Sequence, residues 1–403
     1  MSDEFVVAFV LITIVFVMPL FVYTFSQGIN LRGGFLGWPI LSIPAFYVAW
    51  SAAMNLQNPV QGWDVMGYWG QQAYAFIEHS DASWEKPFQL IWDKHPITLY
   101  LVLAWSGWSA SITDLGMGAV VPWFMCFLSL MLIVAGFAWQ STRSVISTVI
   151  ATMSLISLPL LENHTILAGY GEIFVAAAIV GGCALISIGI TQSSRTFLVF
   201  GLFLLLCLPY IKNTGLAYAM PPIVAYAFVA IFFYSRRVFL GIAIAAIAFL
   251  AAIWQTGISV DLGILSIAFD SEQRIINFGG RELELNSVGT NELFLTEITS
   301  RVLNQSYHLG LSLFLLSCAL LPLVSRQDRR FQSSYIFILL SCALLILMLW
   351  LSLFTDDGLR HALPGADTGH SRLSIPVFTL ISLLLVKTLE AMSNKIVGPV
   401  TDN

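Results

Sequence analysis

Charged residues are scarce in this chain. Only 10% of its 403 residues are Asp, Glu, Lys or Arg, whereas 58% are hydrophobic, and the mean hydropathy is +0.83. Soluble domains carry about 25% charged residues, so the composition excludes a water-soluble fold. The formal net charge of −5 and the lack of a basic stripe also exclude a nucleic-acid-binding protein.

Cysteine is also scarce, and its placement argues against a disulfide framework or a zinc site. The five cysteines all lie inside apolar runs, and no two of them form a CxxC pair. We therefore expect them to pack as small hydrophobic residues. The chain also lacks internal repeats of short period and any soluble domain, since its longest polar stretches are only 56–96 and 257–306.

Apolar runs of membrane-spanning length make up most of the chain. A hydrocarbon core about 30 Å thick takes roughly 20 residues of helix. The predicted spans are 5–25, 36–55, 97–112, 117–140, 144–161, 170–190, 196–211, 217–234, 238–256, 307–324, 332–354 and 373–391. The first run follows Asp3 and Glu4 instead of a basic segment, which favours a retained helix over a signal peptide. The predicted fold is all-α, a polytopic membrane protein of about 11–12 transmembrane helices, with residues 1–403 forming one transmembrane domain.

Basic residues orient these spans, because cytoplasmic turns are enriched in Lys and Arg. The predicted cytoplasmic markers are Arg236–Arg237, the cluster Arg326, Arg329 and Arg330, and Lys387 and Lys395 after the last span. Lys212 and the polar stretches 56–96, 257–306 and 355–371 then lie on the far side of the membrane.

Arg143 conflicts with this scheme if every apolar run crosses the membrane. Two full crossings between His95 and Arg143 would place Arg143 on the far side. The run 97–112 is short and carries several Trp and Ser residues. We therefore predict that 97–112 is a partial or re-entrant helix.

The stretch 56–96 is the first outer loop, and its side chains are the most informative of the chain. Residues 66–79 and 84–93 are amphipathic and contain tryptophan, which predicts two helices lying in the headgroup region. Asp64 precedes the first of them. It is either an N-cap of that helix or a general base at the mouth of a membrane cavity, and the two roles are compatible.

Lys94-His95-Pro96 opens the apolar run 97–112. Proline is favoured in the first turn of a helix, so Lys94 and His95 would flank a helix N-terminus, which favours anions. Both are candidates for binding a phosphate group. The alternative is a snorkelling lysine beside an interfacial histidine.

The order of these motifs resembles the GT-C superfamily of membrane glycosyltransferases, in the branch of protein O-mannosyltransferases and lipid A aminoarabinose transferases. The sequence KHPITLY is similar to that family's His/Lys-Pro-Pro-Leu-Tyr motif, with Ile97 and Thr98 in place of the second proline and the leucine. The family usually has two adjacent acidic residues in its first loop, whereas Asp64 is followed by Val65. The resemblance extends in the same order from about residue 60 to residue 390 and implies a GT-C-like fold.

Three later segments continue the resemblance. Gly169-Tyr170-Gly171-Glu172 is similar to an acidic segment of the family, which makes Glu172 a possible acidic partner. An acidic residue in a first helical turn also stabilises the helix without any catalytic role. Tyr210–Leu216 is similar to a Lys-Asn-Glu-Gly stretch and implies a donor-binding role for Lys212, a residue that is costly on the outer side unless paired or facing water.

The third segment, Ser371–Pro376, is similar to the family's late Arg-Tyr-x-x-Pro segment, which in those enzymes lies near the lipid-phosphate donor. The resemblance implies that Arg372 grips the donor phosphate, with help from His370. A solvated loop with an arginine at the helix start is the alternative.

The resemblance implies transfer of a sugar, with inversion, from a polyprenyl-phosphate or polyprenyl-diphosphate carrier to an acceptor hydroxyl on the non-cytoplasmic face of a bacterial inner membrane. Asp64 would deprotonate the acceptor, and Lys94, Lys212 and Arg372 would hold the phosphate. The expected partners are the lipid-linked donor, a glycan, lipid or protein acceptor, and membrane lipids, without nucleic acid. No cofactor is predicted, because Asp64 lacks an acidic neighbour to share a divalent metal.

Two other functions stay open. A polysaccharide polymerase or O-antigen-ligase-like enzyme would use the late outer loop 257–306, with Arg281, Arg301 and His308. A transporter or flippase for lipid-linked sugars would place ionisable residues at mid-bilayer. Here the ionisable residues gather at span ends on one side, which favours a transferase.

Overall fold

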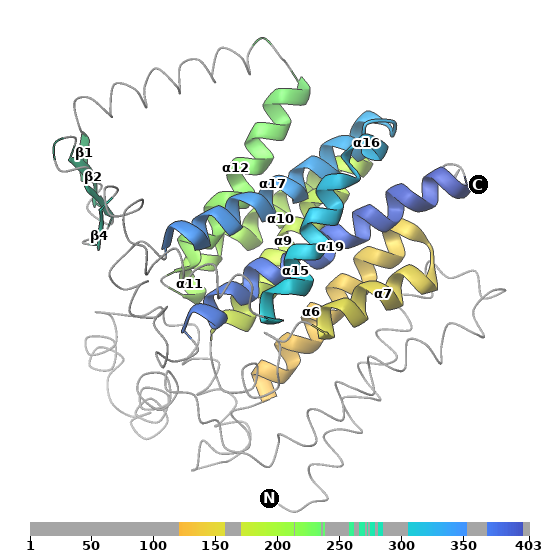
Figure 1. Ribbon diagram of the computed structural model, residues 1–403, viewed down its shortest axis with the longest axis horizontal. Helices are drawn as coiled ribbons and strands as arrows, with labels where there is room; N and C mark the ends of the chain where they lie inside the picture. Colours follow the sequence, from red (N-terminus) through yellow and green to blue (C-terminus); the bar gives the residue numbers. More distant parts are fainter. Residues whose placement is uncertain are drawn as a thin grey trace, which may run out of the picture.

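The computed structural model describes residues 121–157, 171–212, 214–234, 237, 258–261, 266–270, 272, 275–278, 281–284, 305–352 and 369–397. These residues form a bundle of α-helices with one small antiparallel sheet outside it (Figure 1). The predicted spans 5–25, 36–55, 97–112 and 238–256 lie outside the described residues, as does the first outer loop 56–96. The predicted all-α membrane fold is confirmed for the part of the chain that is described.

The helices follow the apolar runs closely. They are α6 (Val121–Thr142), α7 (Val145–Ile156), α9 (Glu172–Gln192), α10 (Arg195–Leu206), α11 (Leu208–Ile211), α12 (Gly215–Tyr234), α15 (Gln305–Ala319), α16 (Leu321–Val324), α17 (Arg329–Ser352) and α19 (Gly369–Val397). Of these, α6, α9, α12, α17 and α19 are long and apolar enough to cross a membrane. The protein is therefore an integral, multi-pass membrane protein. Two predicted spans are broken, 196–211 at Cys207 and 307–324 at Leu320.

The helices alternate in direction, so the bundle has two distinct ends. The ammonium of Lys387 in α19 lies over the rings of Phe137 in α6 and Phe331 in α17. Ser187 in α9 is hydrogen-bonded to Ser334 in α17. The C-terminal halves of α6, α9 and α19 therefore lie at the same end of the bundle as the N-terminal part of α17, which α9 and α19 contact directly.

Exposed arginines gather at one of these two ends, which we call the arginine end. They are Arg143, Arg195, Arg237, Arg326, Arg329 and Arg330. Arg143 lies at the same end as the Arg326–Arg330 cluster, in agreement with the predicted orientation. The opposite end, where α6, α9, α12, α15 and α19 begin, we call the Glu172 end.

The core is formed by α9 and α19, which the other helices surround. Every residue of α19 from Ser374 to Thr388 is buried, and α9 packs against α6, α10, α17 and α19. In contrast, α10 exposes Val199, Phe200 and Phe203, as expected for a helix that faces lipid. The five cysteines are free, and Cys183 and Cys342 are buried in this core, as predicted.

A close approach of α10 to α9 depends on glycine. A Cβ added at Gly201 would lie 2.7 Å from the carbonyl oxygen of Gly182 and 2.7 Å from Ile186 Cγ1. The hairpin between the two helices turns at Ser193, whose φ of 56° is left-handed. Small residues at such a crossing let two backbones pack directly, which is a common source of helix association in membranes.

The polar stretch 257–306 contains a structure that was not predicted. Its strands β1 (Ile258–Asp261), β2 (Ser266–Asp270), β3 (Ile275–Phe278) and β4 (Arg281–Glu284) pair antiparallel in sequence order. Phe278 is paired with Arg281, so only Gly279–Gly280 separates these two strands in the sequence. A Gly-Gly pair between two alternating segments is a recognised hairpin signal, and it was available in the sequence.

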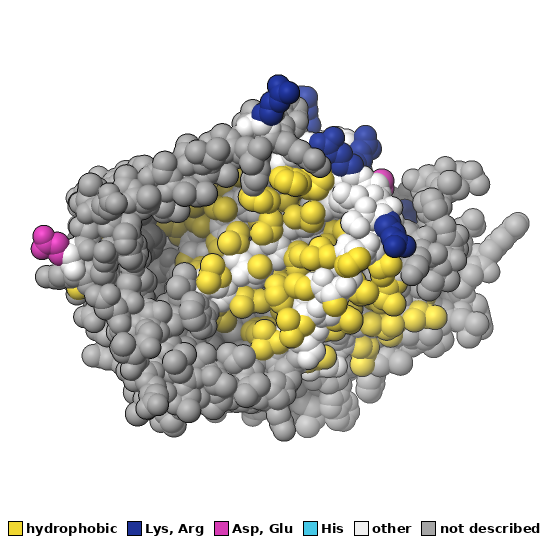
Figure 2. Space-filling model, turned by 45° about the horizontal axis from the view of Figure 1, so that its top comes forward, with side chains coloured by type: hydrophobic (Ala, Val, Ile, Leu, Met, Phe, Trp, Pro, Cys, Tyr) yellow, Lys and Arg dark blue, Asp and Glu magenta, His cyan; other side chains and the backbone are white. Residues whose placement is uncertain are grey.

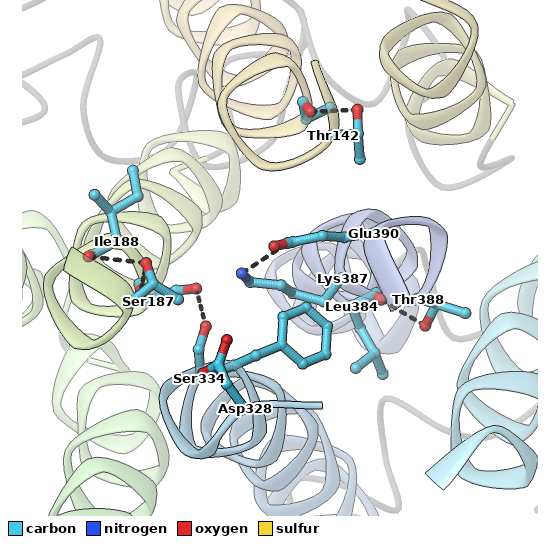
Figure 3. Close-up of polar contacts among 12 residues, drawn as sticks. Thr142, Ser187, Ile188, Asp328, Ser334, Leu384, Lys387, Thr388 and Glu390 are labelled. Carbon is cyan, nitrogen blue, oxygen red and sulfur yellow. Dashed lines mark hydrogen bonds and ion pairs between the residues drawn. The ribbon is translucent and has the colours of Figure 1, made fainter. Parts of the chain in front are cut away.

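A buried polar cluster lies inside the arginine end (Figure 3). Lys387 donates a hydrogen bond of 2.8 Å to Glu390, and its ammonium lies 5.6 and 5.1 Å from the ring centroids of Phe137 and Phe331. The prediction that Lys387 follows the last span is wrong, because the residue lies within α19 and its side chain is only 3% exposed. The carboxylate and the two ring faces replace the water that this charge would otherwise require.

Hydroxyl groups near Lys387 join neighbouring helices at the same level. Tyr335 of α17 donates to the carbonyl oxygen of Ser317 in α15 at 2.8 Å and lies 3.2 Å from Thr388 Oγ1 in α19. Ser317 also contacts Thr388, at 3.1 Å. Such contacts between helices add stability in lipid, which offers little competition for hydrogen bonds.

The close contact between α9 and α10 predicts a specific effect of an added methyl group. We expect Gly201→Ala to lower the free energy of unfolding by about 1–3 kcal/mol, because the Cβ would overpack a backbone contact. Gly136→Ala is the matched control, since nothing lies within 4 Å of the Cβ added there. Thermal unfolding of both variants in detergent would measure the difference, and equal melting temperatures would contradict the contact.

The arginine-end ion pair predicts an asymmetric response to neutralisation. Glu390→Gln would leave the 3% exposed Lys387 without its carboxylate, and we expect a loss of about 3 kcal/mol in unfolding free energy. Lys387→Met should cost less, because the 15% exposed side chain of Glu390 lies closer to solvent. Thermal unfolding of both single variants and the double variant would test this. The double variant should be more stable than Glu390→Gln alone.

Candidate functional site

The described part of the chain contains four of the residues predicted to form the site. Glu172 begins α9, Lys212 follows α11, and His370 and Arg372 lie in the first turn of α19. All four positions are at the Glu172 end of the bundle. Three further predicted site residues, Asp64, Lys94 and His95, lie outside the described residues.

Glu172 and Lys212 form an ion pair, with Lys212 Nζ donating to Glu172 Oε1. The two residues are 40 positions apart in the sequence. The side chain of Glu172 is 3% exposed and that of Lys212 is 14% exposed. Each charge is expensive to bury alone, so the contact lets both remain at the membrane end of the bundle.

The start of α9 holds Glu172 in place by packing. Phe174 contacts Trp123 of α6 edge-to-face, with ring centroids 5.2 Å apart. Cys126, one turn further along α6, donates to the carbonyl oxygen of Ile173 at 3.6 Å. The first turns of α6 and α9 therefore lie side by side. As the first residue of α9, Glu172 also has the favourable interaction with the helix dipole that its position predicted.

A tight turn between α11 and α12 positions Lys212. The Gly215 backbone N–H donates to the carbonyl oxygen of Lys212 at 2.7 Å. A Cβ on Gly215 would lie 2.0 Å from the carbonyl oxygen of Leu208, so only glycine fits at this point. Because α10 and α11 return from the arginine end before this turn, Lys212 lies beside the start of α9.

Two helices that start at this end contain proline within their first eight residues. Pro221 and Pro222 lie in α12, and Pro376 lies in α19. Since proline has no N–H, the carbonyl groups of Ala217, Tyr218 and Arg372 lack the donor that an uninterrupted helix would provide. Carbonyl groups released in this way often line polar sites in membrane proteins.

Polar groups that were not predicted lie near the ion pair. Tyr218 of α12 is only 2% exposed and lies within electrostatic reach of Glu172. The hydroxyl oxygen of Thr214 is buried and has no hydrogen-bond partner among the described residues. Both follow Lys212 within six positions. Their short distance from Lys212 in the sequence was the signal that could have marked them as part of the site. The apolar neighbours of Tyr218 instead suggest an ordinary core residue.

The arrangement is suited to binding an anion. An ammonium group has three N–H donors, and the contact with Glu172 uses one of them. The helices α6, α9, α12, α15 and α19 all direct their positive dipole ends to this side of the bundle. No group of three His, Cys, Asp or Glu residues able to hold a metal ion occurs in the part of the chain that the structure covers.

No family model, curated protein or solved structure matches this chain. The physical arrangement at the Glu172 end is therefore the main basis for assigning a function.

The Glu172–Lys212 pair predicts a stability effect opposite in sense to that of the Lys387–Glu390 pair. Here the carboxylate is the more deeply buried partner, so Lys212→Met should cost about 3 kcal/mol in unfolding free energy and Glu172→Gln less. The double variant Glu172→Gln/Lys212→Met should recover part of the loss. Thermal unfolding in detergent would measure all three variants, and additive losses in the double variant would argue against the ion pair.

Proposed function

We propose that this protein is a membrane glycosyltransferase that moves a sugar from a polyprenyl-phosphate or polyprenyl-diphosphate carrier to an acceptor hydroxyl. The observation that carries the proposal is the contact between Glu172 and Lys212. Separate motifs mark Lys212 as a donor-binding residue and Glu172 as a possible acidic partner, and the two side chains meet at one end of the bundle. Arg372 and His370 begin a helix at the same end.

The proposed reaction is a single displacement at the anomeric carbon of the sugar. The acceptor oxygen bonds to that carbon as the bond between the carbon and the carrier phosphate oxygen breaks, and the acceptor proton passes to Asp64. Negative charge develops on the departing phosphate. Lys94, Lys212 and Arg372 would stabilise it, because fixed cations are most effective where charge develops.

Glu172 would act on Lys212 and not on the substrate. Its buried carboxylate holds the ammonium at one position, so that little reorganisation is needed when a phosphate arrives. The remaining donors of Lys212 could then bind phosphate oxygens while the contact with Glu172 persists. The acceptor in this proposal is a glycan, a lipid or a protein.

The charge distribution supports a site on the non-cytoplasmic side. Exposed arginines mark the opposite end of the bundle, and cytoplasmic ends of membrane proteins are enriched in basic residues. The Glu172 end then faces outward. For a bacterial inner membrane, this is the side of the periplasm or cell exterior, where the transfer would build a cell-envelope glycan.

A transporter or flippase for lipid-linked sugars is the second candidate, and the Lys387–Glu390 pair favours it. Buried ionisable residues in membrane proteins often mark a transport pathway. Here the central helices α9 and α19 carry one buried ion pair at each end of the bundle. Two such pairs could serve as outer and inner gates.

Transfer assays on matched lysine variants distinguish the two functions. The purified protein would be reconstituted with a panel of radiolabelled polyprenyl-phosphate sugars and a membrane extract as acceptor. We expect Asp64→Asn to reduce transfer about 10²–10⁴-fold, as for loss of a general base. Lys212→Met should reduce it about 10²-fold or more, as for loss of a stabilising cation.

Lys387→Met is the control, because it removes a buried, paired lysine far from the proposed site. A transferase with its site at the Glu172 end should keep its rate per folded molecule in this variant. Loss of lipid flipping in both lysine variants, without any glycosyl product, would instead identify a transporter. Folded Asp64→Asn and Lys212→Met proteins with wild-type transfer rates would refute the proposed site.

A further inference from the structure

A second charged surface lies at the arginine end, far from the proposed site. Arg326 follows α16, and Arg329 and Arg330 begin α17. All three are exposed, and we call residues 325–330 the arginine turn. Figure 2 shows dark blue Lys and Arg side chains standing along one margin of a broad apolar surface, most of them close together.

The arginine turn is held in shape by other polar groups. Asp328 Oδ1 accepts the backbone N–H of Arg330 at 2.8 Å and caps α17. Gln332 Nε2 donates to the carbonyl oxygens of Ser325 and Gln327, at 3.1 and 2.7 Å. The arginine side chains take no part in these bonds, so the turn presents them on a fixed backbone.

The charges of the arginine turn are poorly compensated within the protein. Arg326 and Arg330 form no ion pair with any residue the structure describes. Arg329 lies 5.8 Å from the ring centroid of Phe233 in α12, which offers only a weak electrostatic contact. The turn holds three arginines and one acidic residue, Asp328, so a net positive charge remains, and a bound anion would offset it.

Apolar surface lies directly beside the arginine turn. Phe233 contacts Phe232, and Phe232 stacks on Phe228, so that aromatic rings continue along α12 away from the charged end. Phe228 and Leu321 of α16 are 39% and 38% exposed. The surface thus combines cations at the level of the headgroups with the exposed ring of Phe228 and the partly exposed rings of Phe232 and Phe233 at the level of acyl chains.

We propose that the arginine turn binds the headgroup of an anionic glycerophospholipid, whose acyl chains lie along the phenylalanine residues of α12. Guanidinium groups bind phosphate through paired hydrogen bonds. The cytoplasmic leaflet supplies anionic lipids that attract basic segments next to a span. A free phosphate ion would satisfy the charges but could not use the exposed rings. The phospholipid is therefore the occupant that fits both features.

Two charge-matched double variants test this site. Arg326→Gln/Arg330→Gln removes two charges from the arginine turn. Arg143→Gln/Arg195→Gln removes two exposed charges from other turns at the same end. Thermal unfolding of the full-length chain in detergent would be followed against phosphatidylglycerol, phosphatidylcholine and inorganic phosphate at constant ionic strength.

We expect phosphatidylglycerol to raise the melting temperature of the wild type and of the Arg143→Gln/Arg195→Gln protein. For Arg326→Gln/Arg330→Gln, the half-saturating lipid concentration should rise about 30-fold. Each arginine is expected to contribute about fivefold to lipid affinity, and the two losses multiply. An equal rise in both double variants would show diffuse attraction and overturn the site. Equal stabilisation by phosphatidylcholine, or by inorganic phosphate alone, would also overturn it.

Discussion

A charge can be buried in this bundle only where an opposite charge lies against it, and this requirement organises both of its ends. At the Glu172 end the carboxylate is the deeper partner, and at the arginine end Lys387 is. Both deeper partners belong to the central helices α9 and α19. Lys212 thereby attaches the α11–α12 turn to the core, while Lys387 and its aromatic neighbours join α19 to α6 and α17. The more accessible partner is therefore a lysine at the Glu172 end and a glutamate at the arginine end.

The spans of the described region were predictable because apolar runs of this length have few alternatives to a membrane helix. The predicted span 332–354, for example, corresponds to α17 (Arg329–Ser352). The breaks at Cys207 and Leu320 were not predicted, because hydropathy continues through both. Pro209 and Pro322 follow these breaks by two residues, and they were the available local signal. The strands between Ile258 and Glu284 were missed because their polar residues suggested a solvated loop, although apolar and polar residues alternate in Ile258–Asp261.

The candidate site was only partly predictable. Glu172 and Lys212 could each be selected individually, because an acidic helix start and an outer-side lysine are unusual in a chain this apolar. Their contact could not be predicted, since it depends on how α9, α10 and α11 fold back on one another through Gly182, Gly201 and Gly215. In the sequence, Lys387 is read as a marker of topology because basic residues at the end of a span usually indicate the cytoplasmic side. Glu390, three positions later, was the sign of an internal pair.

The combined length of α10 and α11 bears on how a bilayer would fit around the protein. From Arg195 to Ile211, α10 and α11 would extend about 25 Å, less than the roughly 30 Å of a typical hydrocarbon core. Such a mismatch is relieved when the lipid beside the helix becomes thinner, and α10 exposes Phe200 and Phe203 as a lipid-facing helix would. Local thinning of the bilayer at this helix would bring nearby lipid headgroups closer to Lys212. The deficit in helix length would thereby reduce the depth to which any lipid-borne phosphate has to descend to meet that lysine.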